Sequence, residues 1–493
     1  MNHLTKRGLI FVSLATALYF TGSFVADAAE PRAKNVILFI GDGMGFNSDI
    51  MGSYWRVGKA DGLAYHKFPV KGSVATFSIH KDANGDAQWN PETDFGYVPE
   101  EFWKGPQGGN YRHAHTATTD SAASATAINT GHKTVNGYVN YSITGEKLEN
   151  FASMNCKAGR SVGVVVSCQI SHATPACVSA HNISRNAYEE ISTEQINDPT
   201  LSVLMGAGRP AYNNGRKIDK SADELNYQYV GGRGVWEKVS SNDGYNGWTF
   251  MEERADFAAL AAKTPDQGAE LPKKVLGVAR SCDDVAPIDG DADDPESMIE
   301  RFTKETVEAT PSLTEMTLGA LNVLSQTDNG FYLMVEGANI DRANHGRNAA
   351  KSVLEHAAFS KAIDAAVDWV EKYSSWDETI MIVTADHETG QIWGAGTFDD
   401  VNNDGKYSEK DDVFNGLQPV PETEKGVVPD VQYLSSGHTN ALVPIYIKGV
   451  GAENYAQFVR GDDEKAGEMW NFDGTYIYNG DIFSIMVSAT GLK

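Results

Sequence analysis

The chain has 493 residues and a formal net charge of −25 at pH 7, with 66 Asp and Glu residues against 41 Lys and Arg. Three or four average domains would fit this length, but α/β folds are often larger, so length alone does not decide the domain count. The acidic excess disfavours nucleic acid as a specific partner, because the phosphate backbone is itself anionic. Capture of a small anionic substrate would need locally concentrated cations, such as metal ions and arginines.

The N-terminus has the pattern of a secretory signal peptide. Lys6 and Arg7 precede an apolar run from Leu9 to Phe24, which is followed by Ala26-Asp27-Ala28. Such a segment is normally cleaved, so we expect residues 1–28 to be a signal peptide and the product to be periplasmic or secreted. No later run is long and apolar enough to span a bilayer, so we expect no membrane attachment after cleavage.

The four cysteines are Cys156, Cys168, Cys177 and Cys282. In an exported chain, a structural disulfide is favoured over a thiol catalyst, and four cysteines allow three pairings. The sequence does not choose among these pairings.

Seven apolar runs predict buried strands, which are residues 35–40, 71–77, 161–167, 275–281, 331–335, 379–385 and 442–447. The first is followed by Asp42, the fifth by Glu336, and the sixth by Asp386 and His387. In open α/β sheets the ligands bind at the carboxyl ends of the strands, so we expect these side chains to share one sheet edge. The alternative for Asp42 taken singly is the turn residue of an Asp-Gly pair.

Ser121 lies where a helix is predicted to begin. Thr119 and Asp120 suit an N-cap, the Ala-rich run that follows favours a helix, and Gly131 suits its end. The first turn has unpaired N–H groups and the positive end of the helix dipole, so an anion bound there would lie beside the Ser121 hydroxyl. The alternative is a packed Ala-rich helix whose first turn happens to contain a serine.

Histidines and carboxylates further along the chain add to this pattern. Asp341 and His345 are four residues apart, which is one helical turn and lets both reach a single cation. His438 precedes the last predicted strand. Convergence of these residues beside Ser121 predicts a multi-metal hydrolytic site. His113, His115 and His132 flank the Ser121 segment without matching a ligand position, and we expect them to be structural.

Taken together, these motifs resemble those of the alkaline phosphatase family and follow the family's order over nearly the whole mature chain. The resemblance rests on Asp42, Thr119-Asp120-Ser121-Ala122, His172-Ala173-Thr174-Pro175, Ser184-Arg185, Glu336 with Asp341 and His345, Thr384-Ala385-Asp386-His387 and Gly437-His438-Thr439. It implies an α/β three-layer sandwich around a large, mostly parallel sheet, with a crown-like insertion region. It also implies one domain over residues 29–493, with insertions near 78–112, 190–270 and 390–432, and a homodimer.

The resemblance further implies the roles of individual residues. One zinc site falls on Asp341, His345 and His438, and a second on Asp42, Asp386 and His387, facing Ser121. A magnesium site falls on Asp42, Thr174 and Glu336. Arg185 corresponds to the arginine that clamps phosphate, because its planar fork suits two oxygens. The family carries either Asp or His at the position of His172, and histidine is a poor direct magnesium ligand, so we expect His172 to meet magnesium through water or to contact phosphate. The role of Arg342 stays open.

The implied activity is hydrolysis of a broad range of phosphate monoesters through a phosphoserine on Ser121. A phosphodiesterase or sulfatase of the same superfamily is an alternative, although Ser121-Ala122-Ala123-Ser124-Ala125 lacks the proline and arginine of a sulfatase nucleophile motif. A second alternative is a non-catalytic exported protein that binds metal or phosphate. The sequence does not identify the physiological substrate.

The last motif is independent of this resemblance and lies in residues 400–411. Oxygen-bearing side chains occupy loop positions 1, 3, 5, 9 and 12, and glycine occupies position 6. This is the spacing of an EF-hand calcium loop, in which position 7 contributes its carbonyl. The predicted calcium ligands are therefore Asp400, Asn402, Asp404, Lys406 and Asp411. An acidic surface turn is the alternative, since Asp411 stands where Glu is usual.

Overall fold

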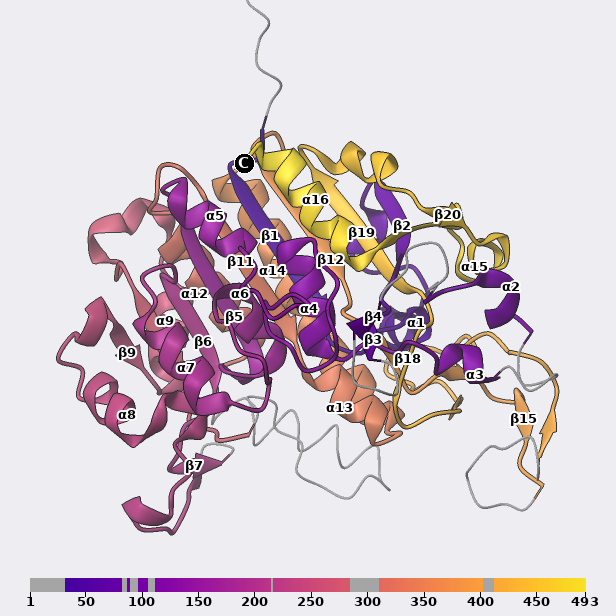
Figure 1. Cartoon of the computed structure of the whole chain (residues 1–493), viewed down its shortest axis with the longest axis horizontal. Coiled ribbons are helices and arrows are strands. Elements are labelled where there is room, and N and C mark those ends of the chain that lie inside the picture. The colour runs from indigo at the N-terminus through magenta and orange to yellow at the C-terminus, as the bar shows by residue number, and fades with distance from the viewer. Residues whose placement is uncertain are drawn as a thin grey trace, which may run out of the picture. The chain divides into compact units, whose positions relative to one another are not determined.

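An eleven-stranded sheet lies at the centre of the fold (Figure 1). The computed structural model describes residues 32–81, 87–88, 96–104, 111–213, 216–283, 310–401 and 412–493. Of these, Arg32–Lys493 forms one compact unit. The predicted signal peptide lies outside the described residues, and so does the predicted calcium loop except Asp400 and Val401. Within the described part of the chain, no helix is long and apolar enough to cross a membrane.

Most strand pairs of the central sheet are parallel, and only β12–β19, β19–β2 and β20–β21 are antiparallel. In spatial order the strands are β20 (Gly461–Asp462), β21 (Thr475–Tyr478), β2 (Val70–Ala75), β19 (Val443–Gly449), β12 (Thr379–Thr384), β1 (Asn35–Gly41), β11 (Phe331–Gly337), β5 (Ser161–Gln169), β6 (Val203–Ala207), β10 (Val275–Val278) and β9 (Thr249–Met251). Every residue of β1, β5, β11 and β12 is buried. Strands covered on both faces carry continuous apolar runs, which explains why the sequence revealed them.

Two groups of helices cover the two faces of the sheet. One group contains α1 (Phe46–Val57), α9 (Arg254–Ala261), α12 (Leu313–Leu324), α13 (Asn339–His345) and α14 (Ala349–Tyr373). The other contains α4 (Ser121–Thr130), α5 (Phe151–Lys157), α6 (Ala173–Ser179) and α16 (Asn479–Thr490), and Figure 1 shows α4, α6 and α16 on the near side of the sheet. The predicted three-layer α/β sandwich is therefore confirmed.

The core forms where α14 packs on β1. Phe359 of α14 meets Phe39 of β1 edge to face, with ring centroids 5.9 Å apart, and both side chains are fully buried. Burial of one such side chain contributes about 1.5–3 kcal/mol. These contacts fix the strand that leads into Asp42.

The other helices and strands lie at the ends and edges of the sheet. The helices are α2 (Pro99–Phe102), α3 (Tyr111–Ala114), α7 (Tyr188–Asn197), α8 (Gly232–Ser240) and α15 (Glu464–Trp470). Short strand pairs are β3 (His80–Lys81) with β4 (Ala87–Gln88), β7 (Tyr212–Asn213) with β8 (Arg216–Lys217), β13 (Glu388–Thr389) with β18 (His438–Thr439), β14 (Ile392–Gly394) with β17 (Val431–Tyr433), and β15 (Phe398–Asp399) with β16 (Val413–Phe414). Thus the described parts of 390–432 contribute the short pairs β14–β17 and β15–β16, whereas residues 190–270 supply β6 and β9 of the central sheet.

The expectation of a disulfide is wrong, because all four cysteines lie in the described part of the chain and all are free. Cys168 belongs to β5, and its thiol points toward the Gln169 carbonyl and the Glu336 carboxyl. Cys177 belongs to α6 and donates to the Ala122 carbonyl. The buried thiols are thus directed at oxygen acceptors on neighbouring elements and not at one another.

Candidate active site and metal centre

The ends of β1, β11 and β12 bring the predicted carboxylates to one edge of the sheet. Ile40 of β1 pairs with Glu336 of β11 on one side and with Thr384 of β12 on the other. Asp42 lies two residues after Ile40, and Asp386 lies two residues after Thr384. The two aspartates therefore leave neighbouring strands at the same level of the sheet. The turn after β1 is tight: Gly43 has a φ of +68°, and a Cβ there would come within 2.8 Å of Asp341. Its backbone N–H donates to Asp386 Oδ1 at 3.1 Å. Only glycine fits this turn.

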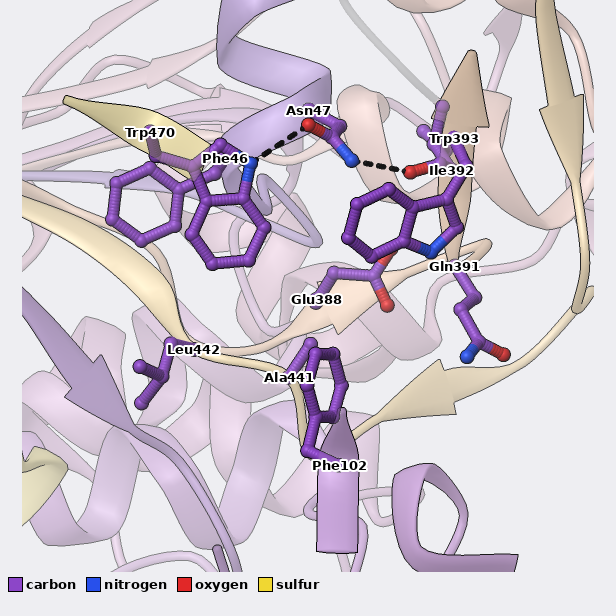
Figure 2. A pocket seen from close by; sticks show the side chains of 10 residues that line it. All are labelled: Phe46, Asn47, Phe102, Glu388, Gln391, Ile392, Trp393, Ala441, Leu442 and Trp470. Carbon is purple, nitrogen blue, oxygen red and sulfur yellow. Dashed lines mark hydrogen bonds between the residues drawn. The ribbon is translucent and has the colours of Figure 1, made fainter. Parts of the chain in front are cut away.

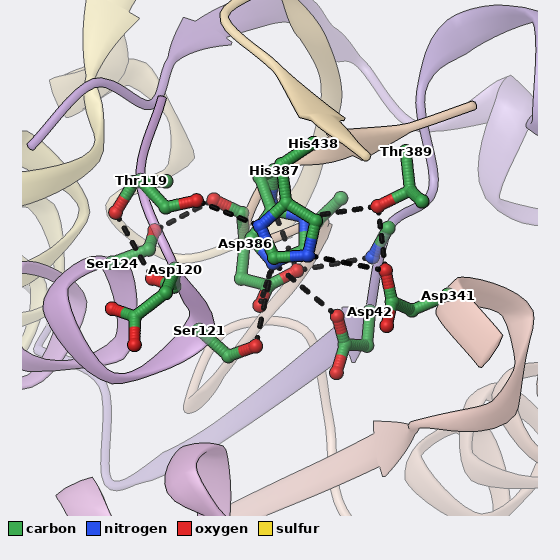
Figure 3. A network of polar contacts seen from close by, with 12 residues as sticks. Asp42, Thr119, Asp120, Ser121, Ser124, Asp341, Asp386, His387, Thr389 and His438 are labelled. Atoms are coloured by element: carbon green, nitrogen blue, oxygen red, sulfur yellow. Dashed lines mark hydrogen bonds and ion pairs between the residues drawn. The ribbon is translucent and has the colours of Figure 1, made fainter. Parts of the chain in front are cut away.

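Helix α4 begins at Ser121, as the sequence predicted. Asp120 is the N-cap, and its Oδ1 accepts from the Ala123 N–H at 2.9 Å. The helix ends at Gly131, which is in the left-handed region with a φ of 75°. Ser121 is buried, and its Oγ lies 3.3 Å from His387 Nε2 (Figure 3). The serine hydroxyl therefore faces the predicted metal ligands from the positive end of a helix.

Asp42, Asp386 and His387 form a first group of buried ligand-type side chains. Each has one ligand atom within 4.8 Å of those of the other two. His387 Nε2 lies 3.1 Å from Asp386 Oδ2 and 3.6 Å from Asp42 Oδ1. This is the set predicted for the second zinc site, and Figure 3 shows these side chains turned toward one another and toward Ser121.

Asp341, His387 and His438 form a second group with the same spacing. His345 also belongs here, since its Nε2 lies 3.2 Å from Asp341 Oδ2 and 3.1 Å from His438 Nε2. Helix α13 carries both Asp341 and His345, one turn apart as predicted. The outer ring nitrogens are held by backbone carbonyls, His345 Nδ1 by Ser436 at 2.6 Å and His438 Nδ1 by Thr119 at 2.8 Å. Both Nε2 atoms are thereby left facing Asp341, as in metal-binding histidines.

A third set of side chains lies next to the group of Asp42, Asp386 and His387, and it consists of Glu336, Thr174 and His172. Glu336 is fully buried, and both Thr174 and Asp42 are close to its carboxyl. His172 is the N-cap of α6, which places Thr174 in the first turn of that helix. His172 stacks on Tyr188 with ring centroids 6.5 Å apart. The residues predicted for the magnesium site are therefore neighbours.

Arg185 is fixed by Asp120, since its Nη1 donates to Asp120 Oδ2 at 3.0 Å. That oxygen also accepts from the Gly137 N–H at 3.0 Å, so the helix cap and the arginine share one carboxylate. Arg342 donates to Gln169 Oε1 at 3.0 Å. Burial of the Arg185 guanidinium lowers its pKa, but the adjacent Asp120 carboxylate outweighs burial and raises it. Arg185 is thus a permanently cationic group.

The buried charges perturb one another strongly. Burial raises the pKa of Asp42 well above its usual range, and the nearby Asp386 carboxylate raises it further. Burial likewise raises the pKa of Glu336 to about 8. A hydrogen bond with Asp341 raises the pKa of His345 to about 9, whereas burial, together with His387, lowers the pKa of His438 to about 4. Such crowding of carboxylates favours the binding of cations.

Several buried polar atoms have no hydrogen-bond partner within the described residues, namely Asp42 Oδ1, Asp386 Oδ2, Glu336 Oε1, Thr174 Oγ1 and His172 Nδ1. An uncompensated buried polar atom costs about 1–3 kcal/mol, so a cluster of five calls for ligands. Carboxylate oxygens and imidazole nitrogens suit zinc, and the all-oxygen set of Asp42, Thr174 and Glu336 suits magnesium. The residues present therefore fit the predicted cations.

Sequence reasoning missed three residues that support the site. Thr389 of β13 donates to Asp341 Oδ1 at 2.5 Å. His115, which we expected to be structural, hydrogen-bonds to the backbone of His438. Glu388 is buried and accepts from the Thr439 hydroxyl. Figure 2 shows Glu388 beside a small cavity among aromatic side chains. Thr389 could have been found from its position two residues after His387, but nothing in the sequence marks its partner.

Comparisons with known proteins agree with this arrangement. Among curated relatives, alkaline phosphatase 4 of Bacillus subtilis is 28% identical over 77% of this chain and 68% of its own. The repressible alkaline phosphatase of Saccharomyces cerevisiae is 30% identical over 79% of this chain and 62% of its own. The solved alkaline phosphatase of Thermus thermophilus shares the fold, with 20% identity, a TM-score of 0.57, and coverage of 97% of this chain and 96% of that one. The sequence model described as "Alkaline phosphatase" matches residues 33–489, and the chain therefore belongs to the alkaline phosphatase family.

Proposed function

We propose that this protein hydrolyses a broad range of phosphate monoesters through a phosphoserine on Ser121. The observation that carries the proposal is the position of the Ser121 hydroxyl, at the start of α4 and 3.3 Å from His387 Nε2 in the Asp42, Asp386 and His387 group. A nucleophile beside metal ligands needs no histidine base, because coordination lowers the pKa of a hydroxyl.

The chain's own groups bind and orient the phosphoryl group. The free N–H groups at the start of α4 and the cationic Arg185 attract the phosphoryl oxygens. Asp120 holds Arg185 at 3.0 Å and caps α4, so it aligns the arginine with the nucleophile. Guanidinium hydrogen bonds to the non-bridging oxygens stabilise the charge that spreads over them as the ester bond breaks.

We propose two zinc ions and one magnesium ion as cofactors. Zinc would be held by Asp341, His345 and His438 and by Asp42, Asp386 and His387, and magnesium by Asp42, Thr174 and Glu336. Bound there, the ions supply Lewis acidity at the nucleophile and at the leaving oxygen. His172, whose Nδ1 is unpartnered, would reach magnesium through water or contact phosphate. A solved TAB5 alkaline phosphatase mutant has Mg bound in the M3 site.

A comparison of three chromogenic substrates tests this function. p-Nitrophenyl phosphate should be cleaved fastest at alkaline pH, and a chelator should abolish the activity. Faster cleavage of bis-p-nitrophenyl phosphate would favour a phosphodiesterase, and faster cleavage of p-nitrophenyl sulfate a sulfatase. Absence of turnover of all three by zinc- and magnesium-loaded protein would favour a non-catalytic metal- or phosphate-binding protein.

We also propose that the protein is exported and forms a homodimer. Export rests on the signal-peptide pattern of residues 1–28, and the dimer on the family resemblance. N-terminal sequencing of the periplasmic product would give a start near Ala29 if the signal is cleaved. Light scattering coupled to gel filtration would give twice the chain mass for a dimer, and the chain mass itself would refute it.

Calcium binding by residues 400–411 is a separate proposal that rests on spacing alone. Calcium should raise the melting temperature at fixed zinc and magnesium, without being needed for turnover. The double variant Asp400→Ala/Asp404→Ala should lose this shift. An equal shift in both proteins, or in neither, would show the segment to be an ordinary turn.

A further inference from the structure

We propose that a cavity bounded by α1, β2 and residues 469–472 binds a small zwitterion, an α-amino acid with an apolar side chain. The cavity has a volume of about 260 Å³. None of its lining residues belongs to the proposed metal sites, nor are Ser121 and Arg185 among them. The proposal is therefore independent of the chemistry at Ser121.

A buried hydrogen-bond network forms the inner wall of the cavity. Asp49 is 1% exposed and accepts from Tyr65, His66, His356 and Tyr446, at 2.6 to 3.0 Å. Burial raises the pKa of this carboxyl, but His66 and His356 outweigh burial and hold it well below its usual range. Asp49 is thus an ionised carboxylate whose four acceptor positions are filled, so it holds His66 in place and offers nothing further to a ligand.

His66 supplies the observation that points to a ligand. Its Nε2 lies 2.9 Å from Asp49 Oδ2, and the ionised carboxylate requires this nitrogen to carry the proton. His66 is 3% exposed and lines the cavity, and Nδ1 has no partner among the described residues. A polar group of a ligand in the cavity would satisfy this nitrogen.

Two groups of opposite charge also line the cavity. Lys71 lies on β2 directly opposite Tyr446 of β19, and Asp61 lies on the segment between α1 and Tyr65. Within the part of the chain that the structure describes, neither forms an ion pair. A monoatomic ion or a singly charged ligand would leave one of them unmatched, whereas an α-amino acid offers a carboxylate to Lys71 and an ammonium to Asp61.

The remaining wall is apolar. Phe46 stacks on Trp470 and on Phe472, with ring centroids 4.5 Å and 5.2 Å away, and Met469 and Ile50 also line this wall. A cavity of about 150 Å³ accepts benzene, so 260 Å³ has room for an aromatic or branched aliphatic group as well as a charged head. By contrast, the neighbouring cavity in Figure 2, which shares Phe46 and Trp470, has about 20 Å³ and room for one water.

Calorimetric titration of the metal-loaded protein with L-leucine and L-phenylalanine tests the proposal. Saturating inorganic phosphate is included, so that the catalytic centre is occupied. Both amino acids should bind saturably. 3-Methylbutylamine and 4-methylpentanoate, which keep the side chain but carry one charge, should bind about tenfold more weakly or worse, because each lacks one charge-assisted contact.

Charge-removing variants locate the site. Lys71→Met and Asp61→Asn should each weaken L-leucine binding by about tenfold or more. Lys67→Met is the matched control, since Lys67 is exposed and does not line the cavity, and it should bind as wild type does. Melting temperature and p-nitrophenyl phosphate turnover establish that each variant is folded. Absence of saturable binding, equal binding of the singly charged analogues, or unchanged binding by both cavity variants would overturn the proposal.

Discussion

The Thr389 hydroxyl donates a hydrogen bond of 2.5 Å to Oδ1 of Asp341. Both side chains are buried, and Thr389 also lies 3.3 Å from His387 Nδ1. One threonine therefore contacts a proposed ligand of each zinc site. Hydrogen bonds from such neighbouring residues orient the metal ligands, and loss of one commonly lowers metal affinity by about 10–100-fold.

Thr389→Val should lower zinc affinity by about 10–100-fold, because the isosteric side chain cannot hold Asp341 in place. Competition against a chromogenic chelator measures the change. Thr389→Ser should restore most of the affinity. Thr397→Val is the control, because within the described residues its buried hydroxyl bonds only to the Gly394 carbonyl and the Gln418 N–H. Wild-type affinity in Thr389→Val would show that Asp341 is held by other groups.

Removal of a proposed zinc ligand should lower the metal content. His438→Ala and Asp341→Ala should each lose about one zinc per chain, whereas Thr174→Val should mainly weaken magnesium, because three protein ligands are the usual minimum for a zinc site. Elemental analysis of the purified variants gives the stoichiometry. Unchanged zinc content in both of the first two variants would refute the assignment.

Arg185→Lys should lower kcat/KM by about 10–100-fold, since the point charge of lysine cannot reproduce a two-pronged contact with phosphate. Steady-state kinetics with p-nitrophenyl phosphate measure this effect. The matched control is Arg209→Lys, which affects an ion pair with Glu252 and not the α4 cap. A kcat/KM equal to that of wild type would mean that Arg185 only anchors Asp120.

Asp49 should stabilise the fold in a pH-dependent way. Because its pKa in the folded state is depressed, its contribution is complete above the unfolded pKa of about 3.9 and is lost progressively as the pH falls below that value toward the depressed folded pKa. Asp49→Asn should therefore cost about 3–5 kcal/mol near neutral pH and show a shallower loss of stability between about pH 5 and 3.

Chemical denaturation at fixed metal concentration measures the Asp49 effect. The control is Asp462→Asn, an exposed aspartate, which should follow the wild-type acid profile. Parallel acid profiles for Asp49→Asn and wild type would mean that the carboxylate contributes no charge-dependent stability.

The central strands and helix α4 could be predicted because local signals decide them. Residues 35–40, 331–335 and 379–385 are continuous apolar runs, and the observed strands β1, β11 and β12 begin at the same residues. Asp120 and Gly131 cap α4 as predicted, because capping depends only on neighbouring residues. Five of the site residues followed, since each lies at or just beyond the end of one of these elements: Asp42, Ser121, Glu336, Asp386 and His387.

Other features depend on contacts between distant segments and carry no local signal. Strand β6, with Val203–Ala207, was not predicted because its five residues are too few to show a period. The Asp49 network joins residues up to 397 positions apart. The free cysteines lie on elements whose separation only the tertiary structure reveals. The sequence therefore predicts which elements meet at the sheet edge, but not the side chains that support them.

The most direct test of the proposed mechanism is to identify the phosphorylated residue during turnover. The metal-loaded enzyme is mixed with p-nitrophenyl phosphate, quenched in acid within the first turnovers, digested, and analysed by tandem mass spectrometry. The account predicts phosphoserine at Ser121 in wild type, and neither phosphopeptide nor appreciable activity in Ser121→Ala. Phosphate on another residue, or near-normal turnover by Ser121→Ala, would contradict it.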